Sequence, residues 1–486
     1  MKRNFMSLAA AFALSLLVTG AVTLADDATD YGIFIGDTEI TSVNASDVFG
    51  DGTVSFDAAT YTLTLNGAEL SADDCAGISN ESAQNLTISV TGDSSIEVTE
   101  DDGIYSDGPL TITGPGVLTI TADYNAVSVC SSVIIQEADL AADTGNYGIY
   151  LYDGASITIT DSVLDIASEW DSIYGSNEEN DVDLLITDSE LTLSSASYDG
   201  CALYSEGSIT IADSSLVIDK SEAMGITAFG NINITGSDLT VSCLGMGILA
   251  NNTLTIKDSA LNISADIIFD YIAFGILAYD IELTDSYVKA AASDSTMSAA
   301  IAAYNSFTIN DPCIIYSPGN AELSVVSITD IEELYTVVLS EDGSVCLDVI
   351  IAAAYEITFA DEDGTVLETG TWLYNETPEY TGDTPTKAED DTYTYTFTGW
   401  DKEISPVTGE EIYTAVYEAE EKETKEDTEE DTEDASEDTA DTAESDSAAS
   451  ADESPKTGDS LNPVFLAAAA LLAAAAGALT LKRRDW

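Results

Sequence analysis

Short segments in which apolar and polar residues alternate recur through the middle of the chain. In "ITITDSVLDI", which begins at Ile157, apolar residues alternate with polar ones on both sides of an Asp-Ser corner. Such alternation predicts short strands with one buried face. Clear and fainter copies of the segment begin at Leu63, Leu86, Leu110, Val133, Ile157, Leu184, Ile209, Ile232, Leu254, Ile281 and Phe307.

The spacing of these copies, about 24 residues, predicts a stacked repeat fold. A unit of this length buries its apolar side chains only by stacking on its neighbours, as in a parallel β-solenoid. We therefore expect a mainly β protein with a right-handed parallel β-helix of about 11 coils over residues 63–330. An N-terminal β cap is expected over residues 26–62. Leucine-rich repeats have a similar period, but their Leu and Asn pattern is absent.

The pattern changes after the repeats. Residues 331–353 read as a connecting segment, and "YEITFADEDGTVLETG" from Tyr355 predicts two strands around an Asp-Gly turn. A small β module is expected over residues 354–418, with Trp400 as the anchor of its core. Residues 419–453 are nearly all Glu, Asp, Thr, Ser and Ala, which predicts a disordered, self-repelling and extended spacer.

Both ends of the chain carry export and anchoring signals. Residues 1–25 have a basic start, an apolar run and small residues before Ala25, the arrangement of a secretory signal peptide cleaved after that residue. Residues 464–481 form an apolar stretch long enough for a transmembrane helix, and a basic tail follows it. Because positive charge tends to stay in the cytoplasm, the rest of the chain is expected outside the cell.

The segment before this span resembles a sortase sorting signal. It consists of Ser454, Pro455, Lys456, Thr457 and Gly458, with Ser454 where Leu is most common. The resemblance implies a protein of the Gram-positive cell surface that is cleaved by sortase after Thr457 and joined there to peptidoglycan. Sortase and peptidoglycan are thus expected partners, and the membrane is a partner before processing.

Two further stretches resemble known families of bacterial surface proteins. The stretch "VFGDGTVSFDAATYTLTLNGA" from Val48, with the coils after it, resembles Gram-positive β-helix proteins described as carbohydrate-binding. The phrases "YTFTGWDKEI" and "VTGEEIYTAVYE" resemble a Listeria-Bacteroides repeat, a β-grasp-like module of surface stalks. These resemblances imply display outside the cell and, more loosely, a sugar ligand.

The charge and composition exclude several classes of function. The formal net charge is −76, the chain has no His, and its Arg residues lie only near the two ends. Nucleic-acid binding relies on basic side chains, so nucleic acid is excluded as a partner. Triads and dyads that use His are excluded as well. We expect no cofactor and no metal, and we expect the six Cys to be mostly buried thiols.

The Asp-Ser corners admit two interpretations. Their carboxylates could form a ladder of metal ligands, or Asp and Ser could bond to local backbone amides at each turn, as they commonly do. We favour the second interpretation. The corner aspartates are Asp161, Asp188, Asp213, Asp258 and Asp285.

A column of tyrosines is the candidate binding site. Tyr105, Tyr150, Tyr174 and Tyr204 follow an inward Ile or Leu and are expected to face outward at one equivalent position. Sugars stack on such rings, although Tyr also decorates exposed strands without a ligand. We expect a non-enzymatic adhesin that binds glycans or host matrix. A passive stalk or coat, or a polysaccharide-degrading β-helix enzyme, remains an alternative.

Overall fold

The computed structural model describes residues 28–152, 156–177, 181–198, 200–222, 224–268, 272–295, 297–328 and 334–422. The predicted signal peptide with Ala25, the spacer beyond residue 422, the sorting motif 454–458 and the predicted span 464–481 lie outside these residues. In the described part of the chain, no helix combines the length and apolar character that a bilayer span requires.

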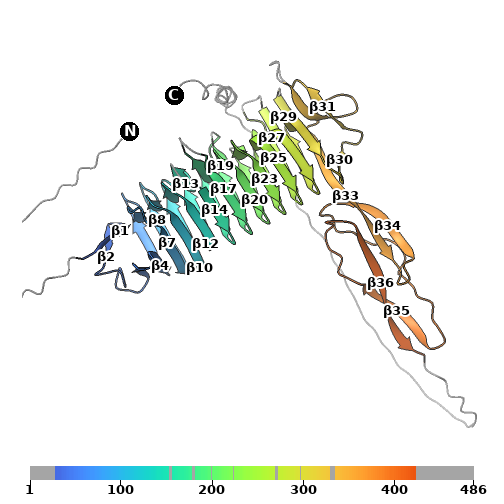
Figure 1. The fold of residues 1–486 in the computed structure, drawn as a ribbon, viewed down its shortest axis with the longest axis horizontal. Coiled ribbons are helices and arrows are strands. Elements are labelled where there is room, and N and C mark those ends of the chain that lie inside the picture. The colour runs from blue at the N-terminus through green and yellow to red at the C-terminus, as the bar shows by residue number, and fades with distance from the viewer. Residues whose placement is uncertain are drawn as a thin grey trace, which may run out of the picture.

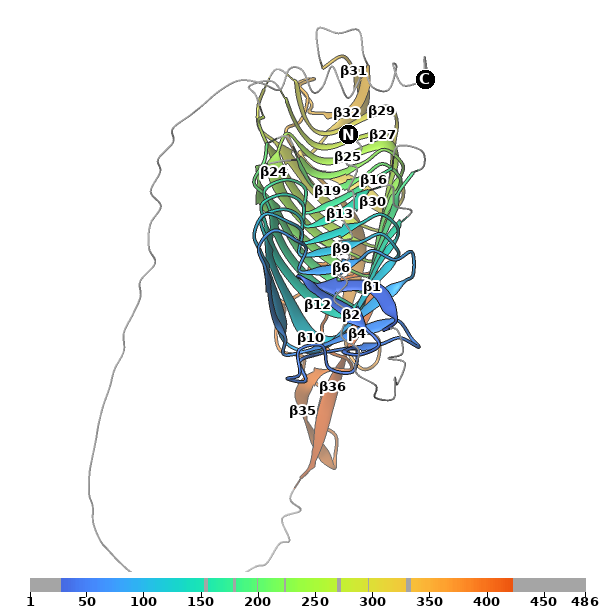
Figure 2. The ribbon, with the colours of Figure 1, turned by 90° about the vertical axis from the view of Figure 1, so that its left-hand side faces the viewer.

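The middle of the chain is a parallel β-solenoid of about ten turns, so the predicted mainly β class and solenoid are confirmed. Each turn contributes one strand to each of three parallel sheets, and the turns stack into a rod (Figure 1). Figure 2 looks from the N-terminal end along this rod. The sequence predicted about eleven coils. The eleventh copy of the repeat, at Phe307, forms only a strand segment that pairs with Ile281 of the preceding turn.

The strands of the three sheets have the following bounds. The first sheet contains β4 (Thr62–Asn66), β7 (Leu86–Gly92), β14 (Ser156–Thr160), β17 (Asp183–Thr187), β20 (Ile209–Ala212) and β23 (Ile232–Thr235). The second contains β5 (Glu69–Ala72), β8 (Ser94–Val98), β15 (Val163–Ser168), β18 (Glu190–Ser195), β21 (Ser215–Ser221), β24 (Asp238–Leu244), β26 (Ala260–Asp266) and β28 (Tyr287–Ala292). The third contains β6 (Ile78–Asn80), β9 (Ile104–Ser106), β11 (Val127–Val129), β13 (Ile149–Tyr152), β16 (Ile173–Ser176), β19 (Cys201–Ser205) and β22 (Met224–Ala228). Longer strands pass from one sheet to the next: β10 (Leu110–Ala122), β12 (Val133–Thr144), β25 (Met246–Lys257), β27 (Ile272–Thr284) and β29 (Met297–Ile309).

The alternation seen in the sequence corresponds to the inside and outside of the rod. Ile157 and Ile159 are buried, whereas Thr158 between them is partly exposed. In the register of the first sheet, Ile157 pairs with Leu184 of the next turn, which pairs with Ile209. Apolar residues therefore stack on apolar residues of the neighbouring turns and form one core that runs along the rod.

Antiparallel strands cover the open edges at both ends of the solenoid. At the N-terminal end, β1 (Asp30–Ile35) pairs with β2 (Thr38–Thr41) and β6, and β3 (Val54–Asp57) pairs with β4. At the other end, β30 (Cys313–Ser317), β31 (Glu322–Val326), β32 (Tyr335–Leu339) and β33 (Asp348–Ala360) follow the last turn. There β32 pairs with β29, and β33 pairs with β28. These strands saturate edges that would otherwise pair with another chain.

Strand β33 belongs to both the solenoid cap and the C-terminal module. Its first half pairs with β28 and β30, and its second half pairs with β34 (Val366–Leu373) and β36 (Glu411–Glu421). Because β35 (Tyr393–Trp400) pairs with β36, the module is a mixed sheet in the order β34-β33-β36-β35. Residues 331–353, expected as a connection, thus contain β32 and the start of β33. Strand β36 extends past residue 419 into the predicted spacer.

The core of the module is centred on Phe359. Phe359 is fully buried, and its ring centroid lies 4.8 Å from that of Trp400 and 5.3 Å from those of Tyr380 and Tyr413. Trp400, expected as the core anchor, is only partly buried and packs at the side of this group. Between β34 and β35 the chain is irregular, so the β-grasp and Listeria-Bacteroides assignments remain predictions.

The corners between the first and second sheets form a ladder of buried serines, which we call the serine ladder. In each turn, the serine N–H donates to the Oγ of the serine in the next turn, as from Ser189 to Ser214 at 3.1 Å. Each Oγ donates in turn to the carbonyl two residues earlier, as from Ser214 to Ala212 at 2.7 Å. The members are Ser162, Ser189, Ser214, Ser237, Ser259 and Ser286, and Cys313 ends the ladder.

The corner aspartates have a different part in these turns. The five have left-handed φ angles of 46° to 51°, a region that Asp tolerates better than most residues. The side-chain acceptors for backbone amides of neighbouring coils are the serines that follow these aspartates in the sequence. Among the described residues, no group of three or more His, Cys, Asp or Glu side chains is placed to hold a metal ion.

The six cysteines are free thiols, as expected. Cys201, Cys243, Cys313 and Cys346 are buried, and Cys75 and Cys130 are partly buried. Burial is the main cause that raises the pKa of Cys243 to about 12, so this thiol stays protonated and unreactive at neutral pH.

Candidate functional site

The structure places the four predicted tyrosines in one column of the third sheet. Tyr150 pairs with Tyr174 of the next turn, and Tyr174 pairs with Tyr204. Tyr105 occupies the same position, but Ser128 lies between it and Tyr150. Three of the four tyrosines are therefore neighbours, and Tyr105 is separate from them.

The three neighbouring rings stack along the axis of the rod. The centroids of Tyr150 and Tyr174 are 5.5 Å apart with an interplanar angle of 16°. Those of Tyr174 and Tyr204 are 4.9 Å apart at 9°. Tyr105 instead donates its hydroxyl hydrogen bond to Asp107 at 2.6 Å. Because Tyr174 lies between the nearly parallel rings of Tyr150 and Tyr204, both of its faces are occupied.

Four further aromatic residues extend this stack into a larger surface. Tyr147, at the corner before β13, stacks on Tyr150 at 4.7 Å. Beside them, Trp170 lies 6.5 Å from Tyr147, and Tyr152 lies 6.3 Å from Tyr150. At the far end, Phe229 contacts Tyr204 edge to face at 5.9 Å. The aromatic surface, as we call it, consists of Tyr147, Tyr150, Tyr152, Trp170, Tyr174, Tyr204 and Phe229.

The outer members of the aromatic surface are the ones open to a ligand. The exposed fractions are 54% for Tyr152, 39% for Trp170 and 42% for Phe229. The stacked tyrosines between them are partly buried. A sugar ring that packs its C–H groups on an aromatic face would therefore contact the outer residues, while the stack holds them in place.

Polar groups lie between the aromatic ends. Tyr152 pairs with Ser176 of the next turn, and the Glu206 N–H bonds to the Gly175 carbonyl at 3.0 Å, which places Glu206 beside Ser176. One carboxylate oxygen of Glu206 accepts a hydrogen bond from the Asn177 N–H at 3.0 Å. Hydroxyl and carboxylate oxygens flanked by aromatic rings suit the hydroxyl groups and apolar faces of a sugar.

The hydroxyls of Tyr147, Tyr174 and Tyr204 are neutral donors. Burial, followed by the nearby Asp171 carboxylate, raises the pKa of Tyr147 to about 12. Burial is also the main cause that raises the pKa of Tyr174 and of Tyr204. At neutral pH each hydroxyl can therefore both donate and accept a hydrogen bond.

A buried carboxylate lies beneath the aromatic surface. Asp171 is 5% exposed and accepts a hydrogen bond from the Cys201 N–H. Burial raises the pKa of Asp171 to about 7, and this hydrogen bond lowers it only in part. At an equivalent corner of an earlier turn, Asn125 accepts from the Tyr147 N–H at 3.1 Å. Asp171 thus has the structural role of a corner acceptor, and Asn fills the same role without charge.

Residue-by-residue reading of the sequence missed Tyr147, Trp170, Tyr152 and Phe229. Tyr147 and Trp170 lie at the corners that precede the third sheet, outside the alternating segments. The sequence nevertheless contained a signal for these two residues. Tyr147 stands two residues before Ile149, and Trp170 stands three residues before Ile173 in the next repeat. An alignment of the corners, as well as of the strands, would have shown this.

Comparison with protein-family models gives two matches. Residues 41–200 match a family described as carbohydrate-binding domain-containing protein, and residues 452–485 match the LPXTG cell wall anchor motif. The first match includes most of the aromatic surface but ends before Tyr204 and Phe229. Comparisons with curated proteins and with solved structures found no match.

The anchor match makes the chain a cell-wall-anchored surface protein of Gram-positive bacteria, which confirms the predicted location. It implies processing by sortase and linkage to peptidoglycan, the two partners expected from the sorting motif. The match includes Ser454, which stands where Leu is most common, so the sequence still matches the anchor motif in spite of this Ser.

Proposed function

We propose that this protein is a non-enzymatic adhesin that binds glycans through the aromatic surface of its solenoid. The observation that carries the proposal is the arrangement of Tyr152, Trp170 and Phe229, which are exposed around a stack of tyrosines. Tyr152 and Trp170 lie within the residues that match a carbohydrate-binding family, and Phe229 lies beyond them. Rings fixed before binding lose little conformational freedom when a ligand packs on them.

The charge of the chain bears on the kind of glycan. The solenoid is strongly acidic, since residues 63–330 contain 41 Asp and Glu residues and three Lys, and acidic polysaccharides would meet repulsion along the whole rod. Neutral glycans of a host surface or of another cell are therefore the favoured ligands. Anchoring at the C-terminal end would present the solenoid beyond the wall, where such ligands are accessible.

An array of glycans and matrix proteins tests this proposal. The full chain, purified in a detergent without a sugar headgroup, would be compared with a variant that carries Tyr152→Ala, Trp170→Ala and Phe229→Ala. A matched control replaces Tyr279 and Tyr316, two exposed tyrosines outside the aromatic surface, by Ala. Saturable binding that the first variant loses and the control keeps would support adhesion.

The alternatives predict other outcomes of the same experiment. A passive stalk or coat predicts no saturable binding to any component of the array. A polysaccharide-degrading enzyme predicts shortened products when the chain is incubated with the polysaccharides. Binding by the parent that the triple variant retains would mean that the aromatic surface is decoration.

A further inference from the structure

A second candidate site lies at the joint between the solenoid and the C-terminal module. A cleft of about 360 Å³ opens there between the outer face of the second sheet and the turn that follows β34. We call it the joint cleft. Its solenoid wall comes from β24, β26 and β28, and its other wall comes from Tyr374, Asn375 and Glu376.

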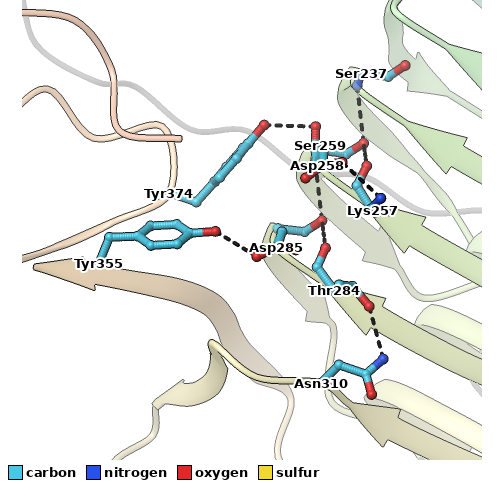
Figure 3. Close-up of polar contacts among 10 residues, drawn as sticks. Ser237, Lys257, Asp258, Ser259, Thr284, Asp285, Asn310, Tyr355 and Tyr374 are labelled. Atoms are coloured by element: carbon cyan, nitrogen blue, oxygen red, sulfur yellow. Dashed lines mark hydrogen bonds and ion pairs between the residues drawn. The ribbon is translucent and has the colours of Figure 1, made fainter. Parts of the chain in front are cut away.

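Two tyrosines of the module fix the position of the overhanging wall. Figure 3 shows both reaching from the module to corner aspartates of the solenoid. Tyr374 donates its hydroxyl hydrogen bond to the Asp258 carbonyl at 2.8 Å, and Tyr355 donates to the Asp285 carboxylate at 2.8 Å. Together with the shared strand β33, these bonds hold the turn over the sheet, so the cleft is formed before any ligand binds.

The turn itself is locked by its own hydrogen bonds. Asn375 has a left-handed φ of 66° and donates its N–H to the Val407 carbonyl at 2.8 Å. One carboxylate oxygen of Glu376 accepts from the Leu373 N–H at 2.7 Å. Asn375 and Glu376 both line the cleft wall.

The solenoid side of the cleft is hollow because the small residue Ala260 lies between two larger residues of the second sheet. Asp238 pairs with Ala260 of the next turn, and Ala260 pairs with Tyr287. The short Ala260 side chain leaves a hollow between the carboxylate on one side and the tyrosine ring on the other. Thr240 and Asn262, the next outward residues on the same strands, form the edge of this hollow.

We propose that the joint cleft binds a pyranose unit that carries no negative charge. Tyr287 and Tyr374 supply aromatic walls on which the C–H groups of a sugar pack, and amides and carboxylates around them match its hydroxyl groups. The lining contains Asp238 and Glu376 and no basic side chain among the described residues, so an acidic sugar would be repelled. The inference is independent of the aromatic surface, which lies on another sheet.

Tyr287 is suited to donate a hydrogen bond to such a ligand. Burial, followed by the Glu376 and Asp348 carboxylates, raises the pKa of Tyr287. Its hydroxyl therefore stays protonated at neutral pH. A neutral hydroxyl beside two acceptors is a combination that a sugar hydroxyl, both donor and acceptor, can satisfy.

Saturation-transfer NMR on the full chain in a detergent without a sugar headgroup tests the joint cleft. The probes are methyl glucoside, methyl galactoside, methyl mannoside, methyl N-acetylglucosaminide and methyl glucuronide. Ala260→Trp fills the hollow, and Tyr287→Ala removes one wall. The matched control is Ser215→Trp, an exposed residue that pairs with Asp238 in the same column but lies outside the cleft. Thermal unfolding of each variant checks the fold.

We expect transfer to at least one neutral glycoside that is lost in Ala260→Trp and in Tyr287→Ala. It should persist in Ser215→Trp and in the triple variant of the aromatic surface. Absence of transfer from the parent, transfer that survives Ala260→Trp, or stronger transfer to the glucuronide than to the glucoside would overturn the proposal. Transfer lost only in the triple variant would refute the joint cleft and leave the proposed adhesin function standing.

Discussion

Removal of one hydroxyl from the serine ladder should weaken the solenoid by a predictable amount. In Ser214→Ala, the N–H of Ser189 loses its only ladder acceptor, and both residues are buried. A buried donor left without a partner costs about 1–3 kcal/mol. Because 1.4 kcal/mol corresponds to a factor of ten, local opening around Ser189 should become about 5 to 150 times more frequent.

Hydrogen exchange measured by mass spectrometry on the full chain is the appropriate assay. Stacked repeats can open locally, so a single free energy of global unfolding would average the effect over the rod. Peptides that contain the Ser189 amide should exchange faster in Ser214→Ala, whereas peptides from the N-terminal cap should not change.

Two further variants make this prediction refutable. Ser215→Ala changes the exposed neighbour of Ser214 and should leave exchange unaltered. Ser214→Cys should have an intermediate effect, because Cys313 already accepts the Ser286 N–H at 3.4 Å at the end of the ladder. If Ser214→Ala and Ser215→Ala gave the same exchange rates, the hydroxyl would contribute nothing and the reasoning would be wrong.

Three other predictions follow from the structure. Because the pKa of Asp171 is about 7 in the folded chain and its ordinary value is 3.8, the folded state binds a proton that the unfolded state releases, and stability should fall as pH rises from about 4 to 7. Asp171→Asn should remove this pH dependence and raise the melting temperature at pH 8 more than at pH 4. An equal change in melting temperature at the two pH values would contradict the prediction. Gly247→Ala should lower the free energy of unfolding, measured with denaturant, by about 1–3 kcal/mol, because the added Cβ would overlap the Ile263 side chain and the Gly275 carbonyl. The control Gly409→Ala should leave it unchanged, because the Cβ at that position has no neighbour within 4 Å. Thr457→Ala should move the protein from the cell-wall fraction to the membrane fraction, and unchanged wall attachment would show that this threonine is not the point of linkage.

Much of the solenoid was predictable from the sequence. Eleven segment starts from Leu63 to Phe307 all lie in strands of the first sheet, because a buried strand with period-two alternation leaves a pattern that survives large changes in residue identity. The burial of Ile157 and Ile159 and the stacking of equivalent positions followed from the same pattern. The wide spacing of the cysteines and their small or apolar neighbours indicated mostly buried thiols. The anchor was readable because a sorting motif is a linear signal.

The candidate sites were only partly predictable. The sequence aligned Tyr150, Tyr174 and Tyr204, but it could not show that their rings stack on one another and leave the binding faces to the outer residues. It also grouped Tyr105 with them, although Ser128 separates the rings in space. Ring orientation depends on the side chains of adjacent turns, which lie more than twenty positions away in the chain.

The sequence by itself determined the repeat, its inward and outward faces and the address at the cell wall, because each of these is encoded within one turn or one motif. Only the tertiary structure decided that β33 is shared between the solenoid and the module, and that Tyr374 reaches Asp258 to form the joint cleft. Tyr374 and Asp258 are 116 positions apart, and the residues that β33 and β28 pair are 57 to 65 positions apart. These contacts depend on where the last turn ends and how the next strand crosses it, which no local pattern of apolar and polar residues specifies.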